Sequence, residues 1–502
     1  MPHTTTSPVQ ERALSVHSRL TQLIESGLDR EQRDLQFIAS LPSELRPSGS
    51  NLICYLALRA QDHRDLQKEL VSLGLSSLGR CEPAVLAALT AVRHAAGRLV
   101  EPPLSGCEPE PVNLSITDGR SMLDRRTDAL LGPRPEGRTV RVMVTMPSEA
   151  ADPASTFVED CIARGTNAFR INTAHDDAAA WGRMIDQVRD ASERADVHCR
   201  VFADLAGPKL RTTHVARRAR SKGAVRLRID DRLLLHRAAD GLPTGAPAEV
   251  WITQPDALGG IRPGHRVGFD DGKLVATVES ASDECAVLRI TNAKPGGQKL
   301  RTGRGVNLPD TPNPLPAITE ADREAIAILA GGVDAFCLSF INRPEDVTEL
   351  LTLLRETDAD PTAVVLKIET RAGFERLPEL LLALMQAPAG GVMIARGDLA
   401  VEIGFARLAE VQEEILWLCE AAHTPVIWAT EVLSSLAKTG QTTRGEVTDA
   451  AMAQRAECVM LNKGPAILEA VSSLTDILGR MEGHQRKKMA TLRPLAVAGA
   501  IT

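Results

Sequence analysis

Aromatic side chains are scarce in this 502-residue chain, at 3% of the residues, and Tyr55 is the single tyrosine. Aliphatic residues must therefore fill the core, and a stacking platform for single-stranded nucleic acid is not expected. The chain contains no run of 18 apolar residues. Its first residues also lack the succession of charged, apolar and small residues that marks a signal peptide. We therefore expect no membrane association.

Neither sign of charge is in large excess, because 58 Lys and Arg residues stand against 65 Asp and Glu residues, for a net charge of −7. This balance gives no electrostatic reason to expect nucleic acid as a partner. The nine cysteines lack the paired spacing of a zinc site, which favours free thiols in a reducing compartment and hence a cytoplasmic protein. The length favours about three domains.

Residues 1–137 are predicted to form a mostly helical N-terminal domain followed by a connector. Apolar residues recur three and four positions apart within 52–56 and 85–92, as expected for helices with one buried face. Prolines accumulate between 101 and 135, which predicts a loop-rich connector with a short helix around 121–131. No catalytic constellation occurs here, and a docking or dimerisation module is the simplest interpretation.

From residue 138 onward, short apolar strands alternate with helical patterns, which predicts an α/β fold with parallel strands. The alternation covers 138–212, stops at 213–304, where short β-like runs are separated by turns, and resumes over 305–485. Three strands before the interruption and five after it predict a (β/α)8 TIM barrel with a small all-β lid domain inserted after strand three. The eight strands are expected at 139–144, 167–172, 198–204, 334–339, 363–369, 391–395, 425–429 and 457–461.

A last helix and a charged tail are predicted after the eighth strand. A helix is expected over 467–481. The charge run at 485–488 is interpreted as a solvated helix end, and residues 486–502 as a C-terminal tail.

Polar residues stand at the predicted carboxyl ends of the barrel strands, where TIM barrels place functional groups. Glu369 and Asp398, on neighbouring strands, could hold Mg²⁺ or Mn²⁺ and leave positions open for substrate oxygens. Arg170, Arg211 and Lys367 could surround phosphoryl oxygens and neutralise the charge that develops during transfer. Ordinary ion pairs would explain any one of these residues, but they explain the whole set poorly.

Several motifs, in one order, resemble the pyruvate kinase family over residues 138–480. They are RINTAH at 170–175, DLAGPKLR at 204–211, DDG at 270–272, GVNLP at 305–309, LPAIT at 315–319, KIE at 367–369, ARGDL at 395–399 and PVIWAT at 425–430. The resemblance implies a TIM barrel with a β lid after strand three. It also implies the glycolytic transfer of a phosphoryl group from phosphoenolpyruvate to ADP with Mg²⁺ or Mn²⁺, followed by protonation of enolpyruvate.

The resemblance also implies a role for each matching residue. Lys367 would stabilise the phosphoryl group in flight, Arg170 and Arg211 would hold phosphate oxygens, and Glu369 and Asp398 would ligate the metal. The substrate would meet the backbone of Ala395, Arg396 and Gly397, the metal ligand Asp398, the hydroxyl of Ser339, and Thr430 on the proton-delivery side. The phosphate and nucleotide region would be lined by Thr145, Asn172, His175 and Asp204.

One departure from the family concerns the monovalent cation. Asn172 and Asp204 remain from the K⁺ ligands, but Ala174 replaces a serine and Leu205 a threonine. Lys209 stands where K⁺-dependent members carry a glutamate, and its ammonium would supply the positive charge in place of K⁺. The expectation is activity without K⁺.

Other departures lie on the family's nucleotide side, at 145–149, at Glu431 and at 462–465. Beyond residue 481 we expect no counterpart of the family's C-terminal domain, which carries a sugar-phosphate effector site and one subunit interface. Residues 1–137 could then supply the interface of a homo-oligomer, or cover the barrel elsewhere.

Two other functions remain open. A barrel that binds a metal and the pyruvate enolate could instead be a lyase or a mutase, although the lid and the paired arginines favour phosphoryl transfer. Alternatively, the barrel could be a non-catalytic ligand sensor with residues 1–137 as the working part.

Overall fold

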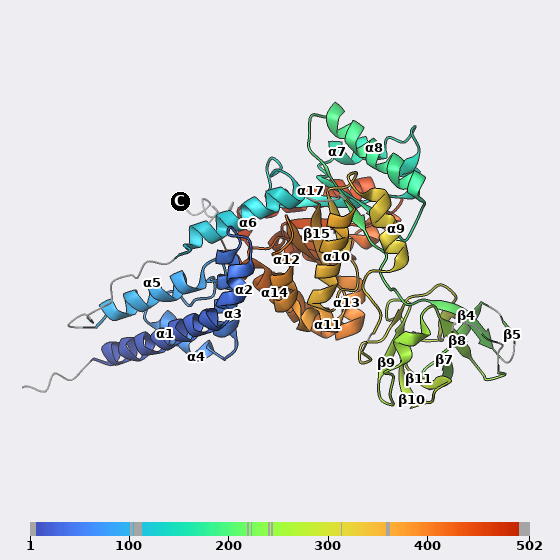
Figure 1. Ribbon diagram of the computed structural model, residues 1–502, viewed down its shortest axis with the longest axis horizontal. Coiled ribbons are helices and arrows are strands. Elements are labelled where there is room, and N and C mark those ends of the chain that lie inside the picture. The colour runs from blue at the N-terminus through green and yellow to red at the C-terminus, as the bar shows by residue number, and fades with distance from the viewer. Residues whose placement is uncertain are drawn as a thin grey trace, which may run out of the picture.

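The computed structural model describes residues 7–100, 104, 113–217, 220–221, 223–238, 241, 244–312, 314–357 and 362–490. Of the connector predicted over 101–137, residues 101–103 and 105–112 lie outside the described residues, as does the tail beyond residue 490. The molecule is elongated, with N-terminal helices at one end, a barrel in the middle and a β domain at the other end (Figure 1). The α/β fold class with its three predicted parts is thereby confirmed.

The N-terminal helices are α1 (Pro8–Arg33), α2 (Leu35–Ser40), α3 (Arg46–Arg59), α4 (Arg64–Ser72) and α5 (Val85–Arg98). A capping box between Ser7 and Gln10 starts α1, whose buried residues are spaced for contact with α3 and α5. Helix α6 (Ile116–Leu131) begins five residues before the predicted short helix, because Ser115 and Asp118 form a second capping box. Leu130 and Leu131 at its end pack into the barrel interior.

The eight predicted barrel strands are all present, with ends shifted by at most two residues. They are β1 (Arg141–Thr145), β2 (Ala168–Asn172), β3 (Arg200–Asp204), β14 (Ala335–Leu338), β15 (Ala363–Ile368), β16 (Gly390–Ala395), β17 (Val426–Ala429) and β18 (Cys458–Leu461). They pair in parallel and close in the order β1-β18-β17-β16-β15-β14-β3-β2. Parallel closure brings the carboxyl ends of all eight strands to one mouth.

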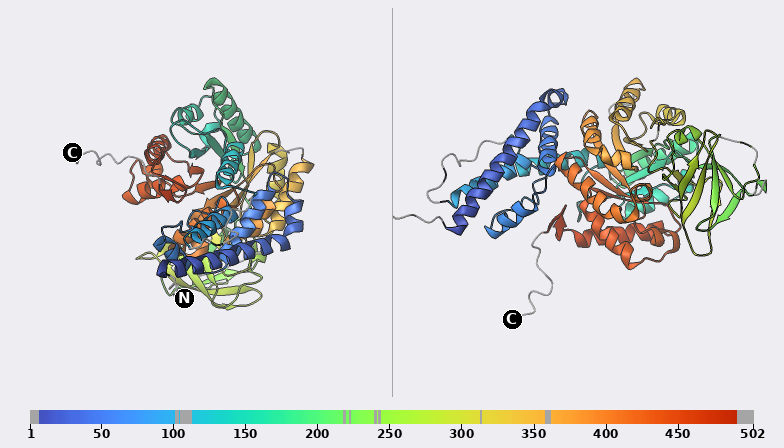
Figure 2. Two further views of the ribbon diagram at one scale, coloured as in Figure 1. Left: turned by 90° about the vertical axis from the view of Figure 1, so that its left-hand side faces the viewer. Right: turned by 90° about the horizontal axis from the view of Figure 1, so that it is seen from below.

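Helices cover the outside of the barrel (Figure 2). They are α7 (Phe157–Ala163), α8 (Ala178–Arg194), α9 (Glu320–Leu329), α10 (Pro344–Glu356), α11 (Arg371–Glu375), α12 (Leu377–Leu384), α13 (Arg396–Ile403), α14 (Phe405–Ala421), α15 (Ser434–Thr439), α16 (Arg444–Met452) and α17 (Ile467–Met481). Short 3₁₀ turns occur at Ser148–Ala151 and Ala453–Arg455. Within the described ranges, no helix is both long and apolar enough to cross a membrane.

The lid lies between β3 and α9. Its strands are β4 (Thr212–Arg217), β5 (Arg220–Ser221), β6 (Ala224–Leu227), β7 (Arg232–His236), β8 (Glu249–Ile252), β9 (Arg266–Phe269), β10 (Leu274–Ala281), β11 (Cys285–Ala293), β12 (Gln298–Arg301) and β13 (Val306–Asn307), with a 3₁₀ turn at Pro255–Leu258. Eight of them form one sheet, and β6 pairs with β12. The lid has a hydrophobic cluster separate from that of the barrel, so it packs as its own unit.

The prediction of a solvated helix end at 485–488 is wrong, because this segment forms a hairpin of β19 (Gln485–Arg486) and β20 (Met489–Ala490). Lys487 Nζ lies 2.5 Å from Glu457 Oε1. Lys488 forms an ion pair with Glu82 of the N-terminal domain and lies 4.9 Å from the centre of the Trp417 ring. Ion pairs with distant residues therefore fix this charged segment in place, although its local sequence suggested that it would be solvated.

His423 joins the N-terminal helices to the barrel. Its ring is fully buried, with Nδ1 2.9 Å from Ser48 Oγ and Nε2 2.8 Å from the carbonyl oxygen of Pro83. A carbonyl can only accept, so Nε2 carries the proton and Nδ1 accepts from the serine hydroxyl. Burial lowers the pKa of His423 from 6.5 to about 4, although the hydrogen bond to Pro83 opposes part of this shift. The ring is therefore neutral at neutral pH.

This burial predicts acid sensitivity. Between pH 6.5 and about 4 the unfolded state binds a proton at His423 and the folded state does not. The free energy of unfolding should therefore fall as the pH drops through this window, by up to about 3 kcal/mol from this group. Urea unfolding of wild type and His423→Asn at several pH values measures the slope, which should be shallower in the variant. Equal slopes would contradict the prediction.

Candidate active site

A cavity of about 380 Å³ opens at the carboxyl ends of the barrel strands. Most of the residues that the sequence predicted to be functional line it. They are Thr145, Arg170, Asn172, His175, Asp204, Lys209, Arg211, Ser339, Lys367, Glu369, Ala395, Asp398 and Thr430. They come from seven of the eight strands and the loops that follow them. Arg396 and Gly397, which were also predicted, are not part of the lining.

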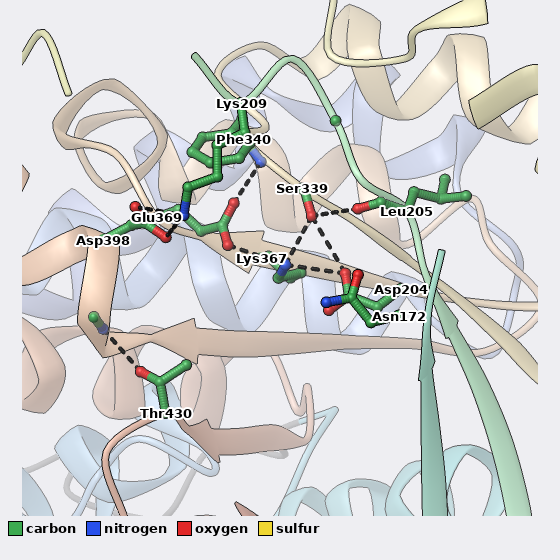
Figure 3. A network of polar contacts seen from close by, with 12 residues as sticks. Asn172, Asp204, Leu205, Lys209, Ser339, Phe340, Lys367, Glu369, Asp398 and Thr430 are labelled. Carbon is green, nitrogen blue, oxygen red and sulfur yellow. Dashed lines mark hydrogen bonds and ion pairs between the residues drawn. The ribbon is translucent and has the colours of Figure 1, made fainter. Parts of the chain in front are cut away.

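Lys367, near the end of β15, stands at the centre of the polar network (Figure 3). Its Nζ donates to Asp204 Oδ1 at 2.9 Å and to Ser339 Oγ at 2.7 Å, and lies 3.0 Å from Glu369 Oε1. Burial alone would lower the pKa of this lysine, but the two carboxylates outweigh burial and raise the pKa above its usual value. The ammonium is therefore charged and fixed in place.

Asp204, at the end of β3, balances two cations. Its carboxylate accepts from Arg170 Nε at 2.5 Å as well as from Lys367, and its side chain is almost fully buried. Burial alone would raise its pKa, but the two cations outweigh burial and hold the pKa below its usual value. Arg170 also donates to Thr145 Oγ1 at 2.9 Å, so its guanidinium is oriented by β1 and β3.

Ser339 orients Lys367 through its hydroxyl. Its Oγ accepts from Lys367 Nζ at 2.7 Å, and it lies 2.6 Å from the carbonyl oxygen of Leu205 and 3.3 Å from Asp204 Oδ1, the two acceptors open to its proton. A hydroxyl has one proton and two lone pairs, so one lone pair is left after the contact with the lysine. The direct contact of Ser339 with substrate stays a prediction.

Glu369 and Asp398 fit a divalent cation. Both are hard oxygen donors that line one cavity. Glu369 directly follows β15, and Asp398 lies at the start of α13, which follows the neighbouring strand β16. The backbone N–H of Phe340 donates to Glu369 Oε2 at 2.8 Å and so orients this carboxylate. Burial raises the pKa of Glu369; Lys367 opposes this rise, and the nearby carboxylate of Asp398 adds to it. A divalent cation between the two carboxylates would relieve their repulsion.

Lys209, in the segment that leads to the lid, reaches across the cavity. Its Nζ donates to both carboxylate oxygens of Asp398, at 3.1 and 3.0 Å, and lies 5.8 Å from the centre of the Phe340 ring. The sequence placed this lysine beside the K⁺ ligands Asn172 and Asp204. In the structure its hydrogen bonds go to the predicted metal ligand (Figure 3).

Thr430 lies in a strained segment directly after β17. Its φ is 60°, and Glu431 and Leu433 also have positive φ, which is uncommon for residues with a Cβ. The hydroxyl oxygen accepts from the N–H of Gly397 at 2.8 Å. The sequence assigned that N–H to a substrate carboxylate, so a bound carboxylate would replace the threonine oxygen as acceptor.

Arg396 turns its side chain away from the cavity. The guanidinium forms an ion pair with Asp449, donates to the carbonyl oxygens of Ala429 (3.2 Å) and Thr430 (2.7 Å), and stacks over Trp428. Only its backbone, at the start of α13, remains available for the predicted contact with substrate. The side chain instead holds the strained end of β17.

Arg211 and His175 lie at the rim of the cavity. Arg211 precedes β4, and its Nη1 donates to the carbonyl oxygen of Gly303 at 3.4 Å, so it stands at the junction of barrel and lid. His175 is an exposed residue, but partial desolvation of its ring, followed by the positive charge of nearby Lys463, lowers its pKa. Both residues are therefore accessible to a ligand that enters below the lid.

Two residues that contact the predicted metal ligands were missed. Phe340 has a φ of 54°, a conformation that nothing in its sequence position indicates. Asn307, at the end of the lid, lies with its Nδ2 3.4 Å from Asp398 Oδ1. The sequence signal for Asn307 was present, since it belongs to the GVNLP stretch, but the motif alone gave it no role.

The family model and the similar proteins described below all point to the same protein family. The model of the pyruvate kinase barrel domain matches residues 137–467. Pyruvate kinase of Geobacillus stearothermophilus is 32% identical over 340 residues, which cover 66% of this chain and 55% of that enzyme. The pyruvate kinase of Methylorubrum extorquens is 31% identical over 69% of this chain and 69% of that enzyme. The pyruvate kinase of Thermotoga maritima is also 31% identical, over 68% of this chain and 70% of that enzyme.

The chain thus spans little more than half the length of the first of these relatives. The matched segment nevertheless contains both halves of the barrel, the lid between them and all the residues gathered around Lys367. The chain belongs to the pyruvate kinase family.

Proposed function

We propose that this protein transfers the phosphoryl group of phosphoenolpyruvate to ADP, giving pyruvate and ATP, with Mg²⁺ or Mn²⁺ as cofactor. One observation carries the proposal above the others. The buried ammonium of Lys367 is held between Asp204 and Glu369 in a cavity that also contains Arg170, Arg211 and Asp398. This arrangement offers cations for phosphoryl oxygens and carboxylates for a metal in one place.

The chain's own residues have distinct parts in this reaction. Arg170, Arg211 and Lys367 bind the phosphoryl oxygens, and the lysine neutralises charge as the bond from phosphorus to the enol oxygen breaks. Glu369 and Asp398 would hold the divalent cation, which would supply Lewis-acid stabilisation of the substrate oxygens. A new bond forms between phosphorus and the β-phosphate oxygen of ADP. The enolate left behind takes a proton at its methylene carbon from the side of Thr430, and pyruvate results.

The direct test is pyruvate formation from phosphoenolpyruvate with Mg²⁺ and ADP, GDP or no nucleotide. We expect turnover that depends on a nucleoside diphosphate. Pyruvate release without nucleotide would indicate a lyase or phosphatase on the same barrel. Ligand binding without any turnover would indicate a sensor, and either result would overturn the proposal.

A further expectation concerns K⁺. Because the ammonium of Lys209 lines the cavity in place of a glutamate, the rate should change by less than about twofold when K⁺ is replaced by tetramethylammonium. In Lys209→Glu the positive charge is lost, so activity should fall and recover on addition of K⁺. Initial rates of both proteins with and without K⁺ measure this, and a large K⁺ stimulation of the wild type would contradict it.

A further inference from the structure

A second cavity, of about 280 Å³, lies at the other end of the barrel. Segments that are distant in sequence form its walls. They are the stretch at 80–83 before α5, helix α6, the beginnings of β1 and β18, the end of α14, and the hairpin of β19 and β20. Arg141 at the start of β1 lines this cavity, and Thr145 at the end of β1 lines the candidate active site. The strand separates the two cavities by about 13 Å, at roughly 3.3 Å per residue.

Cationic side chains outnumber carboxylates in this second cavity, although Arg134 and Arg455 pair with carboxylates outside the lining, Glu482 and Glu413. Eight Arg and Lys side chains and five Asp and Glu side chains line it, although the whole chain carries a net charge of −7. Four of the five carboxylates already form ion pairs with cations of the lining. These pairs are Glu82 with Lys488, Asp124 with Arg486, Asp128 with Arg141, and Glu457 with Lys487. Burial raises the pKa of the fifth, Glu420, to about 7, so it is partly neutral.

Several donors in the lining have no good acceptor. Arg141 has a side chain only 5% exposed, and its Nε has no hydrogen-bond partner in the described part of the chain; the same holds for Arg455 Nε. Arg120, from α6, donates only to the thioether sulfur of Met489, at 3.7 Å, among the residues that the structure describes. Thioether sulfur is a weak acceptor, and a buried donor without an acceptor costs free energy. An oxyanion would supply the missing acceptors.

We infer that this cavity binds a compact oxyanionic metabolite, one that carries phosphate or several carboxylates. Guanidinium groups match the planar pairs of oxygens that such groups present, and the cavity volume suits a small ligand. The ligand would contact α6, the base of the barrel and the hairpin at once. It would therefore stabilise the packing of the N-terminal domain and the hairpin against the barrel. This site is independent of the proposed catalytic function.

The test is calorimetric titration of the full chain with pyrophosphate and, separately, with citrate. Arg120→Gln removes a donor whose one described contact is the thioether, so the variant should keep its fold, which its melting temperature without ligand checks. Arg125→Gln is the matched control, because Arg125 is exposed on the same helix and does not line the cavity. Arg211→Gln reports any anion binding at the candidate active site.

We expect affinity at least about tenfold weaker in Arg120→Gln and unchanged in Arg125→Gln and Arg211→Gln. Arg80→Gln, at the exposed edge of the same lining, should weaken binding as well. Binding of pyrophosphate alone would assign a phosphorylated ligand, and binding of citrate alone a polycarboxylate. The inference would be overturned if the heat of binding persisted in Arg120→Gln and disappeared in Arg211→Gln. It would also be overturned if neither probe bound. None of these readouts requires turnover, so failure here is distinct from failure of the proposed activity.

Discussion

Lys367→Met is expected to lower kcat for phosphoryl transfer from phosphoenolpyruvate to ADP by about a thousandfold. The lysine presents a preorganised positive charge in a water-poor cavity, and removing one such donor typically costs 10²–10³ in rate. The loss should appear in kcat more than in the KM for ADP, because the ammonium acts on charge that develops in the transition state. Steady-state pyruvate formation measures both constants.

The matched control for this variant is Lys463→Met. Lys463 lines the same cavity but is exposed and lies in the loop after β18, so its loss should change kcat far less. Lys367→Met also leaves Asp204 and Glu369 without their shared cation, so the melting temperature of each variant must be compared with the wild type. A folded Lys367→Met protein with near-normal kcat would remove this lysine from the mechanism.

Asp398→Asn is expected to weaken Mn²⁺ binding by about 100-fold or more. The substitution removes a negative charge from the carboxylate pair, and the ammonium of Lys209 then loses its partner and repels a cation. Loss of even an outer-shell partner of a metal commonly costs 10–100-fold in affinity, and a direct ligand should cost at least as much. The electron paramagnetic resonance signal of free Mn²⁺ reports the dissociation constant without any need for turnover.

Asp271→Asn provides the control for the metal experiment. Asp271 lies in the turn between β9 and β10 of the lid, and its side chain is 64% exposed. The same change from carboxylate to amide should there leave Mn²⁺ binding unaltered. Equal Mn²⁺ affinity of Asp398→Asn and the wild type would show that the cation binds elsewhere.

The barrel could be predicted because its signals are local. Each strand is a short apolar run followed by a helical pattern, and such alternation is visible in one sequence without any knowledge of contacts. The helix over 467–481 has the predicted ends, and its buried residues follow the apolar spacing. The candidate site followed from the same argument, because parallel strands deliver residues such as Arg170, Asp204 and Lys367 to one mouth.

What failed depended on contacts between distant segments. The hairpin at 485–490 is held by Glu82 and Glu457, residues that no local pattern connects to it. The direction of the Arg396 side chain, for which the sequence offered no prediction, depends on Asp449 in α16, 53 residues further along the chain. The tertiary packing of distant segments determines which side chains become partners. The periodicity of apolar residues along the sequence does not predict that packing.

Periodicity and order along the chain were enough to predict the eight strands, the inserted lid, the helical N-terminal domain and the set of charged residues at the strand ends. The pairing of these charges could be seen only in the folded chain. The tertiary structure placed Lys209 on Asp398, the hydroxyl of Thr430 on the N–H of Gly397, and a cationic cavity where α6 and the hairpin meet the base of the barrel. Pairing of this kind depends on distances of a few ångströms between residues far apart in sequence, and only the folded chain sets those distances.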